Sequence, residues 1–300
     1  MARQDSLTTA RRIRRQLSSQ QRMEVGQLFF DITSSATDLT LVATPPASLR
    51  AGTIICIDLE VMWVASVNTA TNVVSVIRGY LDSDAAVHLA LALVEIAPRF
   101  TMLDIVDAMI NELNAWGPQL YRTVDQTFTV DTTVETLQLP LAWADLYGVC
   151  QVRQSEVGTT NTVWPQLACK LVRGSAAGFA GASTSGVLLR FLEPLRSGSV
   201  HVVAALPFDA TTVPTNGDLL ATIGMSNSQL DVLELGVRRR LLLQGDNDLN
   251  ARQSQDDSRL AEENPVAGML SIHQLQLALY TRRRTEEANR LARLYPIRMQ

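Results

Sequence analysis

The chain has 300 residues, enough for two domains or for one core with substantial appendages. Hydrophobic residues make up 46% and charged residues 19%, and the low charge suggests that some surface is covered in an assembly. A formal net charge of −4 excludes a general nucleic-acid-binding protein, so any basic function must be local.

Arginine supplies almost all of the positive charge, because Lys170 is the single lysine among 26 basic residues. A GC-rich genome would explain this bias, and arginine also makes better bidentate and stacked contacts at interfaces than lysine does. Cys56, Cys150 and Cys169 form no CxxC pair, which predicts small core residues in a reducing compartment. We find no run of the ~18 apolar residues that a membrane span needs and no signal peptide, which predicts a chain made in a cytoplasm without a membrane partner.

Residues 1–24 are expected to form a basic helical arm, with a helical pattern over residues 3–24. Leu7, Ile13 and Leu17 give a stripe that is too thin to anchor a core helix. The arm is therefore either solvated, or docked on a neighbouring subunit or near phosphate groups. Its candidate interface residues are Arg11, Arg12, Arg14 and Arg15.

Residues 25–98 are predicted to form a small β module. From Asp38 to Ala97 the hydrophobic period shortens to two, and Ile55 and Ile57 alternate with their neighbours as in a strand. The segment Ser66–Asn72 is predicted to be a hairpin turn. A linking helix over residues 99–118 follows, because Thr101 and Asp104 resemble a capping box and Gly117-Pro118 stops the pattern.

Residues 119–206 return to the β pattern, with strand candidates about ten residues apart and rich in Val, Thr, Leu and Phe. This spacing predicts a β-sandwich or jelly-roll-like domain with a small, uncharged loop over Gly174–Gly186. The strand candidates are 126–130, 134–139, 147–153, 167–172, 186–192 and 199–206.

Residues 207–300 are predicted to be a helical docking region, which completes an α+β fold. Ser226 and Gln229 form a second capping box ahead of a first helix. A polar stretch over 244–264 is expected to link it to a last helix over 269–294, on which Glu286 could pair with Arg290. The leucines of that helix are Leu270, Leu275, Leu279, Leu291 and Leu294.

The segment 52–96 resembles a small β module that recurs in neck and tail proteins of tailed bacteriophages. That module has a "G-x-x-I-x-I-x-x-E-x-M-x-V" strand pair, a "V-x-R-G" strand end and an "A-x-x-H" step. The sequence departs from it at Leu81-Asp82-Ser83-Asp84, where a Gly-Thr-rich turn is usual, and at Leu91-Ala92, where a glycine is expected. The matching residues are Gly52, Ile55, Ile57, Glu60, Met62, Val64, Val76, Arg78, Gly79, Ala85 and His88.

The C-terminal segments 218–220, 231–236 and 286–291 look like the tails of phage head-to-tail adaptor proteins, and the two resemblances together cover about half of the chain. They imply a virion structural protein made in the host bacterial cytoplasm. Such proteins form a dodecameric ring under the portal protein, with helices docked on the portal and a channel that double-stranded DNA crosses. The next neck or tail protein would bind the opposite side of the ring.

Glu60, Arg78 and His88 are the polar positions of the β module and could be taken for a catalytic set. Neighbouring strands can bring Glu60 and Arg78 together, and a buried ion pair with a hydrogen-bonded histidine would stabilise the turns. We favour this structural role over an interface role or an acid–base site. Because the three histidines are far apart and no serine-hydrolase or P-loop motif is present, we expect no enzyme, no cofactor and no metal.

Arg238-Arg239-Arg240 and Arg282-Arg283-Arg284 are the strongest charge features. Three consecutive residues surround a helix, so they cannot all point into a core. They either lie on a solvated face, form salt bridges to acidic portal or adaptor neighbours, or contact DNA phosphates. Two other functions stay open: a tail-tube, baseplate or minor tail component, and a receptor- or glycan-binding module, for which Trp143, Tyr147 and Trp164 are the few aromatic candidates.

Overall fold

The computed structural model describes residues 5–17, 24–156, 166–174, 186–213, 218–256 and 266–298, without the side chains of 212, 244–256 and 266–273. The chain forms two compact units, and α2, α3 and α4 contribute residues to both. Both helices and antiparallel sheets are present, so the mixed α+β class predicted from the sequence is confirmed. The first unit comprises Met1–Glu112, Val213–Asp218 and Leu233–Leu279, and the second comprises Leu113–Thr212, Leu219–Val232 and Tyr280–Gln300.

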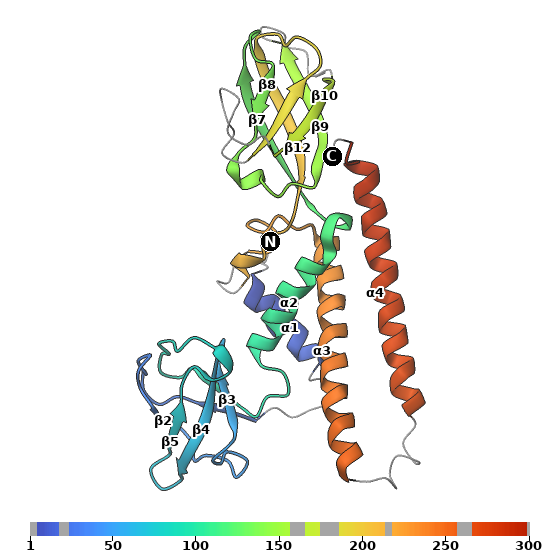
Figure 1. Ribbon diagram of the computed structural model, residues 1–300. Helices are drawn as coiled ribbons and strands as arrows, with labels where there is room; N and C mark the ends of the chain where they lie inside the picture. The colour runs from blue at the N-terminus through green and yellow to red at the C-terminus, as the bar shows by residue number, and fades with distance from the viewer. Residues whose placement is uncertain are drawn as a thin grey trace. The chain divides into compact units, whose positions relative to one another are not determined.

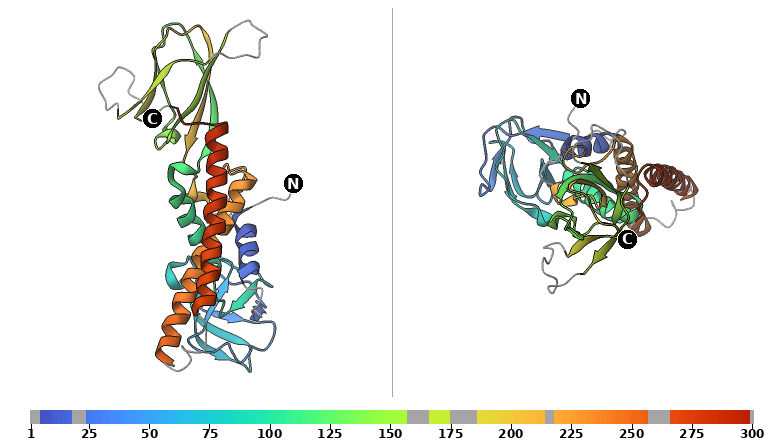
Figure 2. Two further views of the ribbon diagram at one scale, coloured as in Figure 1. Left: turned by 90° about the vertical axis from the view of Figure 1, so that its right-hand side faces the viewer. Right: turned by 90° about the horizontal axis from the view of Figure 1, so that it is seen from above.

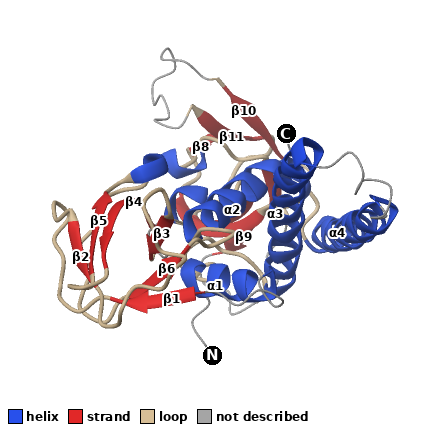
Figure 3. Cartoon of the chain, turned by 90° about the horizontal axis from the view of Figure 1, so that it is seen from below, coloured by secondary structure: helices blue, strands red, loops and turns tan. Residues whose placement is uncertain are grey.

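The first unit contains a curled six-stranded antiparallel sheet with the strand order β1-β6-β3-β4-β5-β2 (Figure 3). An isolated bridge between Leu28 and Leu41 joins the continuations of the two outermost strands, so the sheet curls back on itself. The hairpin predicted at Ser66–Asn72 is present, but its turn is confined to residues 69–72, because Ser66–Asn68 belong to β4 and pair with β5. The strands are β1 (Glu24–Gln27), β2 (Asp38–Thr40), β3 (Ile54–Ile57), β4 (Glu60–Asn68), β5 (Val73–Ile77) and β6 (Leu93–Ile96).

The inner face of this sheet encloses the hydrophobic core of the module. Ile55, Ile57, Met62 and Val64 contribute to it from the central hairpin and are almost completely buried. This burial follows from the alternation of the sequence, because successive side chains of a strand point to opposite faces. The remaining core residues are Leu28, Ile32, Leu39, Leu41, Leu49, Val74, Val76, Val94 and Ile96.

Helix α1 (Ser6–Leu17) packs within the first unit, so the expectation of a solvated arm is wrong. Its buried face consists of Ser6, Thr9, Ala10 and Ile13. Three of these four residues are small, and their fit against neighbouring backbone needs no wide apolar stripe. The helix also ends earlier than expected: residues 18–23 lie outside the described residues, and Glu24 begins a strand.

Helix α2 (Met102–Trp116) confirms the predicted linking helix and its capping box. Asp104 N donates to Thr101 Oγ1 at 3.0 Å, and Thr101 N donates to Asp104 Oδ2 at 2.8 Å. These two bonds satisfy amide groups that a helix start would otherwise leave without partners. The 3-10 turn Gly117–Gln119 follows directly, where Gly117-Pro118 was predicted to stop the helix.

The second unit contains a β-sandwich built from two three-stranded antiparallel sheets, β7-β12-β9 and β10-β11-β8 (Figure 1). All six predicted strands are confirmed, and a core cluster that includes Trp143, Leu146, Leu189 and Val202 fills the space between the sheets. Most of the predicted loop Gly174–Gly186 lies outside the described residues. The strands are β7 (Arg122–Val130), β8 (Thr136–Gln138), β9 (Gly148–Glu156), β10 (Cys169–Arg173), β11 (Val187–Phe191) and β12 (Gly198–Leu206).

Two long helices follow, α3 (Asn227–Asp256) and α4 (Val266–Leu294), and Figure 2 shows α4 unbroken along its length. At 1.5 Å per residue each is about 45 Å long. The capping box predicted at Ser226 and Gln229 is confirmed, because Ser226 N donates to Gln229 Oε1 at 2.7 Å. The linker expected over 244–264 is wrong for 244–256, which continue α3. A polar composition alone does not end a helix when it contains no proline.

Candidate functional site

Glu60, Arg78 and His88 meet inside the β module and form the most closely connected polar group of the first unit. Glu60 begins β4, Arg78 follows β5, and their side chains are 0% and 6% exposed. Arg78 Nε lies 2.5 Å from Glu60 Oε1, and Arg78 Nη2 lies 2.7 Å from Oε2, which makes the ion pair bidentate. His88 Nε2 donates to Glu60 Oε2 at 2.8 Å, because an ionised carboxylate can only accept. The predicted meeting of Glu60 and Arg78 is confirmed.

The guanidinium group of Arg78 has an acceptor for each of its five N–H donors. Two of them bind Glu60, as described above. Nη1 donates to the carbonyl oxygens of Thr33 and Ala36 at 2.8 and 2.9 Å, and Nη2 donates to Ala86 O at 2.5 Å. One side chain therefore joins two loops to the end of β5.

The Glu60 carboxylate is equally well satisfied, and it also accepts from the backbone N–H groups of Gly79 (3.4 Å) and Ala86 (3.0 Å). Burial alone would raise the pKa of Glu60. Hydrogen bonds from Arg78, Ala86 and His88, together with the charge of Arg78, outweigh burial and lower this pKa below its ordinary value. Because the carboxylate is ionised, saturated with donors and inaccessible, it has no capacity left to exchange a proton with a substrate. The cluster holds loops together.

The other residues of the resemblance lie where they support the same module. Met62 is fully buried in its core. Gly52 and Gly79 have φ angles of 88° and 62°, in the left-handed region that glycine tolerates best. A Cβ atom at Gly79 would also come within 3.0 Å of Ser83 O. The turn before β3 and the turn after β5 therefore both depend on glycine.

Left-handed backbone also occurs where the sequence departs from the phage module. Leu81 and Asp82 have φ angles of 54° and 58°, and Leu91 has a φ angle of 66°. In this region a leucine brings its Cβ atom close to the following carbonyl oxygen, at a cost of about 1–2 kcal/mol. Glycine would avoid this strain at Leu81 and Leu91, yet both positions carry a large apolar side chain that is more than half exposed.

A set of exposed apolar side chains lies on the outside of the β module. In the register of β1 and β6, Gln27 pairs with Leu93 and Gly26 pairs with Val94, which is buried in the core. Leu93, the neighbour of Val94 in β6, is therefore directed outward and is 55% exposed, and Leu91 and Leu89, in the turn before β6, are 65% and 69% exposed. We call the full set the outer apolar patch; it comprises Val25, Phe29, Phe30, Val87, Leu89, Leu91 and Leu93.

This patch was not predicted from the sequence, although its signal is visible there. In the run 87–94 the odd positions are Val, Leu, Leu and Leu, while the even positions include His88, Ala92 and Val94. A strand that is apolar on both faces either is covered on both sides within the chain or meets another molecule. The sequence shows both apolar faces but does not tell which of them the chain itself covers.

The arginines of the N-terminal helix differ in their surroundings. Arg12 forms an ion pair with Glu234 of α3, and Arg14 Nη1 lies 2.5 Å from Glu95 Oε2 in β6. Arg11 contacts Asp58 at 3.4 Å in an exposed pair. Arg15 is exposed and forms no ion pair with any side chain that the structure describes. Arg12 and Arg14 therefore bind within their own chain, where the sequence suggested a neighbouring subunit or phosphate.

The triplet Arg238-Arg239-Arg240 on α3 is half-buried and does not form a solvated face. Arg240 Nε lies 2.5 Å from Glu112 Oε2, and the Glu112 side chain is completely buried. Arg238 binds Glu234 at 3.2 Å. A Cβ atom at Gly236 would lie 2.5 Å from the Glu112 carboxyl group, which explains a glycine in the interior of a helix. Arg238 and Arg240 thus balance carboxylates of their own unit.

The triplet Arg282-Arg283-Arg284 on α4 is divided between two environments. Arg282 and Arg283 both bind Glu286, and their side chains are 77% and 61% exposed. Arg284 turns inward, donates from Nη2 to Ala115 O and Trp116 O, and lies over the ring of Tyr280. Only the first two of these three arginines offer charge to the solvent.

The pair expected between Glu286 and Arg290 does not form. Arg290 instead binds Glu287 at 2.6 Å, three residues away, on a side of the helix where Glu287 is almost completely buried. Burial raises the pKa of Glu287, but hydrogen bonds from Arg290, Ser228 and Ser226 and the charge of Arg290 outweigh it, so this pKa is lowered. Both spacings bring side chains together on a helix, and here burial favours the nearer carboxylate.

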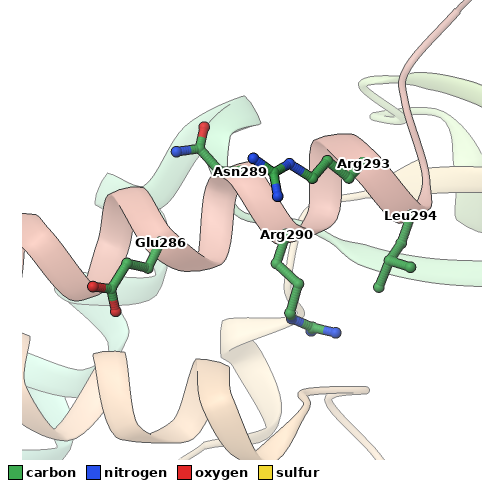
Figure 4. Close-up of a pocket in the computed structure, with 5 residues that line it drawn as sticks. All are labelled: Glu286, Asn289, Arg290, Arg293 and Leu294. Atoms are coloured by element: carbon green, nitrogen blue, oxygen red, sulfur yellow. The ribbon is translucent and has the colours of Figure 1, made fainter.

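A surface hollow of about 390 Å³ lies beside the C-terminal part of α4 (Figure 4). Glu286, Arg290 and Leu294 extend from one side of the helix, as their four-residue spacing requires, and Asn289 and Arg293 complete the lining. The hollow is open to solvent, so it is a surface groove. Its charged residues Glu286 and Arg290 already form the ion pairs described above. No catalytic pair of side chains lies among these five residues.

The remaining candidates for chemistry lie apart from one another. Cys56, Cys150 and Cys169 are buried, as predicted, and burial raises the pKa of their thiols to about 12, 11 and 11. Among the described residues, no three His, Cys, Asp or Glu side chains are grouped closely enough to hold a metal ion. His201 faces Asp125 at 3.3 Å, and the side chain of His273 is not described.

Trp143 lies in the core of the sandwich and Tyr147 is half-buried, while Trp164 lies outside the described residues. Among the helices that the structure describes, none has an apolar stretch of the length that a membrane crossing requires. In the comparisons with known proteins, no protein-family model and no curated protein matches the chain. The geometry of the site must therefore carry the functional argument.

Proposed function

We propose that the chain is a structural protein of a tailed bacteriophage particle, an adaptor that acts by assembly and not by catalysis. In this proposal identical subunits form a dodecameric ring at the head-to-tail junction. The ring joins the portal protein to the next neck or tail protein and surrounds the passage of double-stranded DNA. The chain would be made in the host bacterial cytoplasm and would end up in the virion.

The outer apolar patch is the observation that carries this proposal. Of 17 large apolar side chains exposed among the described residues, ten lie between residues 25 and 93, in a module of about seventy residues. Large exposed apolar side chains gathered in one module are rare in soluble monomers and common in subunits of assemblies. An apolar surface lowers the solubility of an isolated subunit, and we expect neighbouring proteins to bury it in the assembled particle.

The polar cluster supports the same assignment. The residues that resemble the phage neck and tail module, Glu60, Arg78 and His88 above all, are combined into a closed network that holds loops in place. A rigid module that presents loops and an apolar face suits a protein whose task is to be bound by neighbours. A substrate would find neither an accessible acid nor an accessible base in this cluster.

The charge distribution supports an assembly role more than DNA binding. Arg12, Arg14, Arg238 and Arg240, four of the ten candidate interface arginines in the basic arm and the two triplets, bind carboxylates of their own chain and are not offered to phosphates. A passage through which a genome must slide should bind DNA weakly, and a net charge of −4 agrees with that requirement. Arg282 and Arg283 are exposed and suit salt bridges to acidic groups of a neighbouring protein.

Deletion of the gene from the phage that encodes this chain tests the proposal. Because the adaptor joins two finished parts, we expect DNA-filled heads and complete tails to accumulate separately, as seen by electron microscopy of the lysate. Expression of the wild-type chain from a plasmid should restore joined particles. Normal infectious particles without the chain would contradict the proposal.

The same experiment separates the two alternative functions. Loss of a tail-tube, baseplate or minor tail component would leave incomplete tails. Loss of a receptor- or glycan-binding module would leave complete particles that fail to adsorb to cells. The burial of Trp143 and the half-burial of Tyr147 weigh against glycan recognition, since glycan sites need exposed aromatic rings.

A further inference from the structure

Helix α1 covers one end of the outer face of β6, and the outer apolar patch continues from the point where this cover ends. Arg14 of α1 binds Glu95, which pairs with Val25 across the β1–β6 ladder. Beyond Glu95, the outward residues Leu93, Leu91 and Leu89 have no such cover and are more than half exposed. The chain thus already binds a basic helix at Glu95, and the apolar residues beyond it remain exposed.

The exposed part of the face carries a carboxylate that selects a basic partner. Asp31 is exposed, and its Oδ1 accepts from Ala90 N at 2.6 Å, which places the carboxylate beside Leu89 and Leu91. Contact with Glu95 shows how such a carboxylate is matched in this protein, because an arginine on the docked helix reaches it. An occupant of the patch should therefore be a helix with apolar residues followed by arginine.

Helix α4 offers this chemistry on its exposed side. Tyr280, Glu287 and Leu291 are each 4% exposed and mark its buried side. Leu275, Leu279 and Arg282 recur at four- and three-residue spacing on the opposite side. Their exposed fractions are 60%, 44% and 77%. These leucines belong to the stripe predicted for the last helix, and the part of the chain that the structure describes leaves them exposed.

The dimensions of the two surfaces also agree. Leu275 and Arg282 are separated by seven residues of helix, which is about 10 Å at 1.5 Å per residue. Residues 89–92 form a turn in which Ala92 N donates to Leu89 O at 3.1 Å, so Leu89, Leu91 and the Asp31 carboxylate beside them lie together at the start of β6, next to Leu93. This part of the patch is therefore compact enough for two leucines of α4 to contact it while an arginine reaches Asp31.

We propose that the outer apolar patch of one copy binds the Leu275–Leu279–Arg282 face of α4 from the next copy. The two surfaces are different, so the contact is head-to-tail, and each copy has one of each. A head-to-tail contact repeated with a suitable rotation closes into a ring. This inference rests on the proposed function, since it identifies the contact by which the adaptor ring is built.

The strain at Leu91 supports this use of the patch. Leu91 has a φ angle of 66° and is 65% exposed, so neither backbone geometry nor the core of its own chain favours a leucine there. An apolar contact with another copy would explain why this position carries a leucine. Strained residues that persist without a role in folding concentrate at functional surfaces.

Two variants test the contact by removing one surface each. The patch variant carries Leu89→Asp and Leu93→Asp, and the helix variant carries Leu275→Asp and Leu279→Asp. All four leucines are exposed, so circular dichroism and the melting temperature should stay close to those of the wild type. We expect the wild-type chain to associate in sedimentation velocity, and each variant alone to lose at least about tenfold in association constant.

Mixing the two variants gives the decisive observation. The patch variant retains an intact α4 face and the helix variant retains an intact patch, so one productive contact can form between them. We expect one-to-one dimers that grow no further, because the remaining two surfaces are both damaged. Leu192→Asp, at a leucine of the sandwich that is 66% exposed, is the matched control and should associate as the wild type does.

Three results would overturn the inference: a wild-type chain that stays monomeric at its highest soluble concentration, variants that associate like the wild type, or a mixture that forms no dimers. A monomeric wild-type chain would mean that the patch serves a different protein. Mass spectrometry of purified particles keeps this outcome separate from the proposed function. If the chain is present in particles while the variants associate normally, the contact is wrong and the adaptor proposal stands.

Discussion

Glu60 and Arg78 form a buried bidentate ion pair in which two N–H groups of the guanidinium meet the two carboxylate oxygens at 2.5 and 2.7 Å. The remaining donors of Arg78 bind three backbone carbonyl oxygens, and His88 completes the carboxylate shell. In a low-dielectric interior such a pair offsets its desolvation only when all its hydrogen bonds are made. In this protein all of these hydrogen bonds are made, and the loops of the β module depend on the ion pair.

Glu60→Gln should therefore destabilise the first unit strongly. The substitution leaves the charge of Arg78 buried without a counter-charge, and the expected loss is about 3–5 kcal/mol in the free energy of unfolding. Urea denaturation, with hydrogen exchange of peptides from β4 and β5 to identify the unit, measures it. Asp38→Asn, an exposed carboxylate that binds Ser75, is the control and should change stability by about 0.5 kcal/mol or less. Equal stability of the two variants would show that the pair contributes nothing.

The same ion pair predicts a dependence on pH. Because the pKa of Glu60 in the folded chain lies below its ordinary value of 4.5, the stabilisation is complete above that value and is lost as the pH falls through the lowered pKa. The protection of β4 and β5 amides relative to their intrinsic exchange rate at the same pH should therefore decrease as the pH falls below 4.5. In Glu60→Gln this acid-dependent component should be missing. An unchanged acid response in the variant would assign it to other carboxylates.

Gly236→Ala tests the packing of Glu112 against α3. The added Cβ atom would lie 2.5 Å from the Glu112 carboxyl group, which must then move away from Arg240. We expect a loss of about 1–3 kcal/mol, although alanine favours a helix by about 1 kcal/mol over glycine. In a Glu112→Ala background the clash is absent, so the same substitution should be neutral or stabilising. A double-mutant cycle measured by urea denaturation gives the coupling, and its absence would contradict the geometry.

Substitutions in the triplet Arg282-Arg283-Arg284 should differ in their effect on stability, because Arg284 is turned inward and Arg282 is exposed. Arg284→Ala removes donors to two backbone carbonyl oxygens and the contact with Tyr280, and should lower the stability of the second unit by about 1–3 kcal/mol. Arg282→Ala removes an exposed, solvent-screened pair with Glu286 and should cost less than Arg284→Ala does. Thermal denaturation of both variants makes the comparison. A larger loss for Arg282→Ala would reverse the assignment.

Leu91→Gly should separate stability from assembly. Relief of the left-handed strain should raise the stability of the isolated β module by about 1 kcal/mol, less whatever the greater freedom of glycine costs in the unfolded chain. The same variant should associate more weakly than the wild type, because it removes a side chain of the outer apolar patch. Denaturation and sedimentation of one preparation provide both values. A variant that is less stable, or that associates more tightly, would contradict this account.

Local pattern was sufficient to predict most elements of the fold. The alternation around Ile55 and Ile57, the six strand candidates between 119 and 206, and the capping boxes at Thr101 and Ser226 all appear in the structure. These features depend on residues within a few positions of each other. The meeting of Glu60 and Arg78 was also predictable, because a hairpin joins the strands that carry them.

Contacts between distant parts of the chain were not predictable in the same way. Arg12 and Glu234 are 222 residues apart, and Arg14 and Glu95 are 81 apart, so the sequence does not indicate that α1 packs on its own chain. The reason for Gly236 depends on Glu112, more than a hundred residues earlier. The outer apolar patch was missed for a related reason, since exposure depends on what the rest of the chain covers.

The central claim is the proposed place of this chain in a phage neck, and a cryo-EM reconstruction of that neck tests it most directly. The proposed function predicts a closed ring of identical copies between the portal and the tail, with the curled β module recognisable in each copy. It further predicts that each β module contacts a helix of the adjacent copy. Density for the chain elsewhere in the tail, or its absence from the particle, would contradict the assignment as a head-to-tail adaptor.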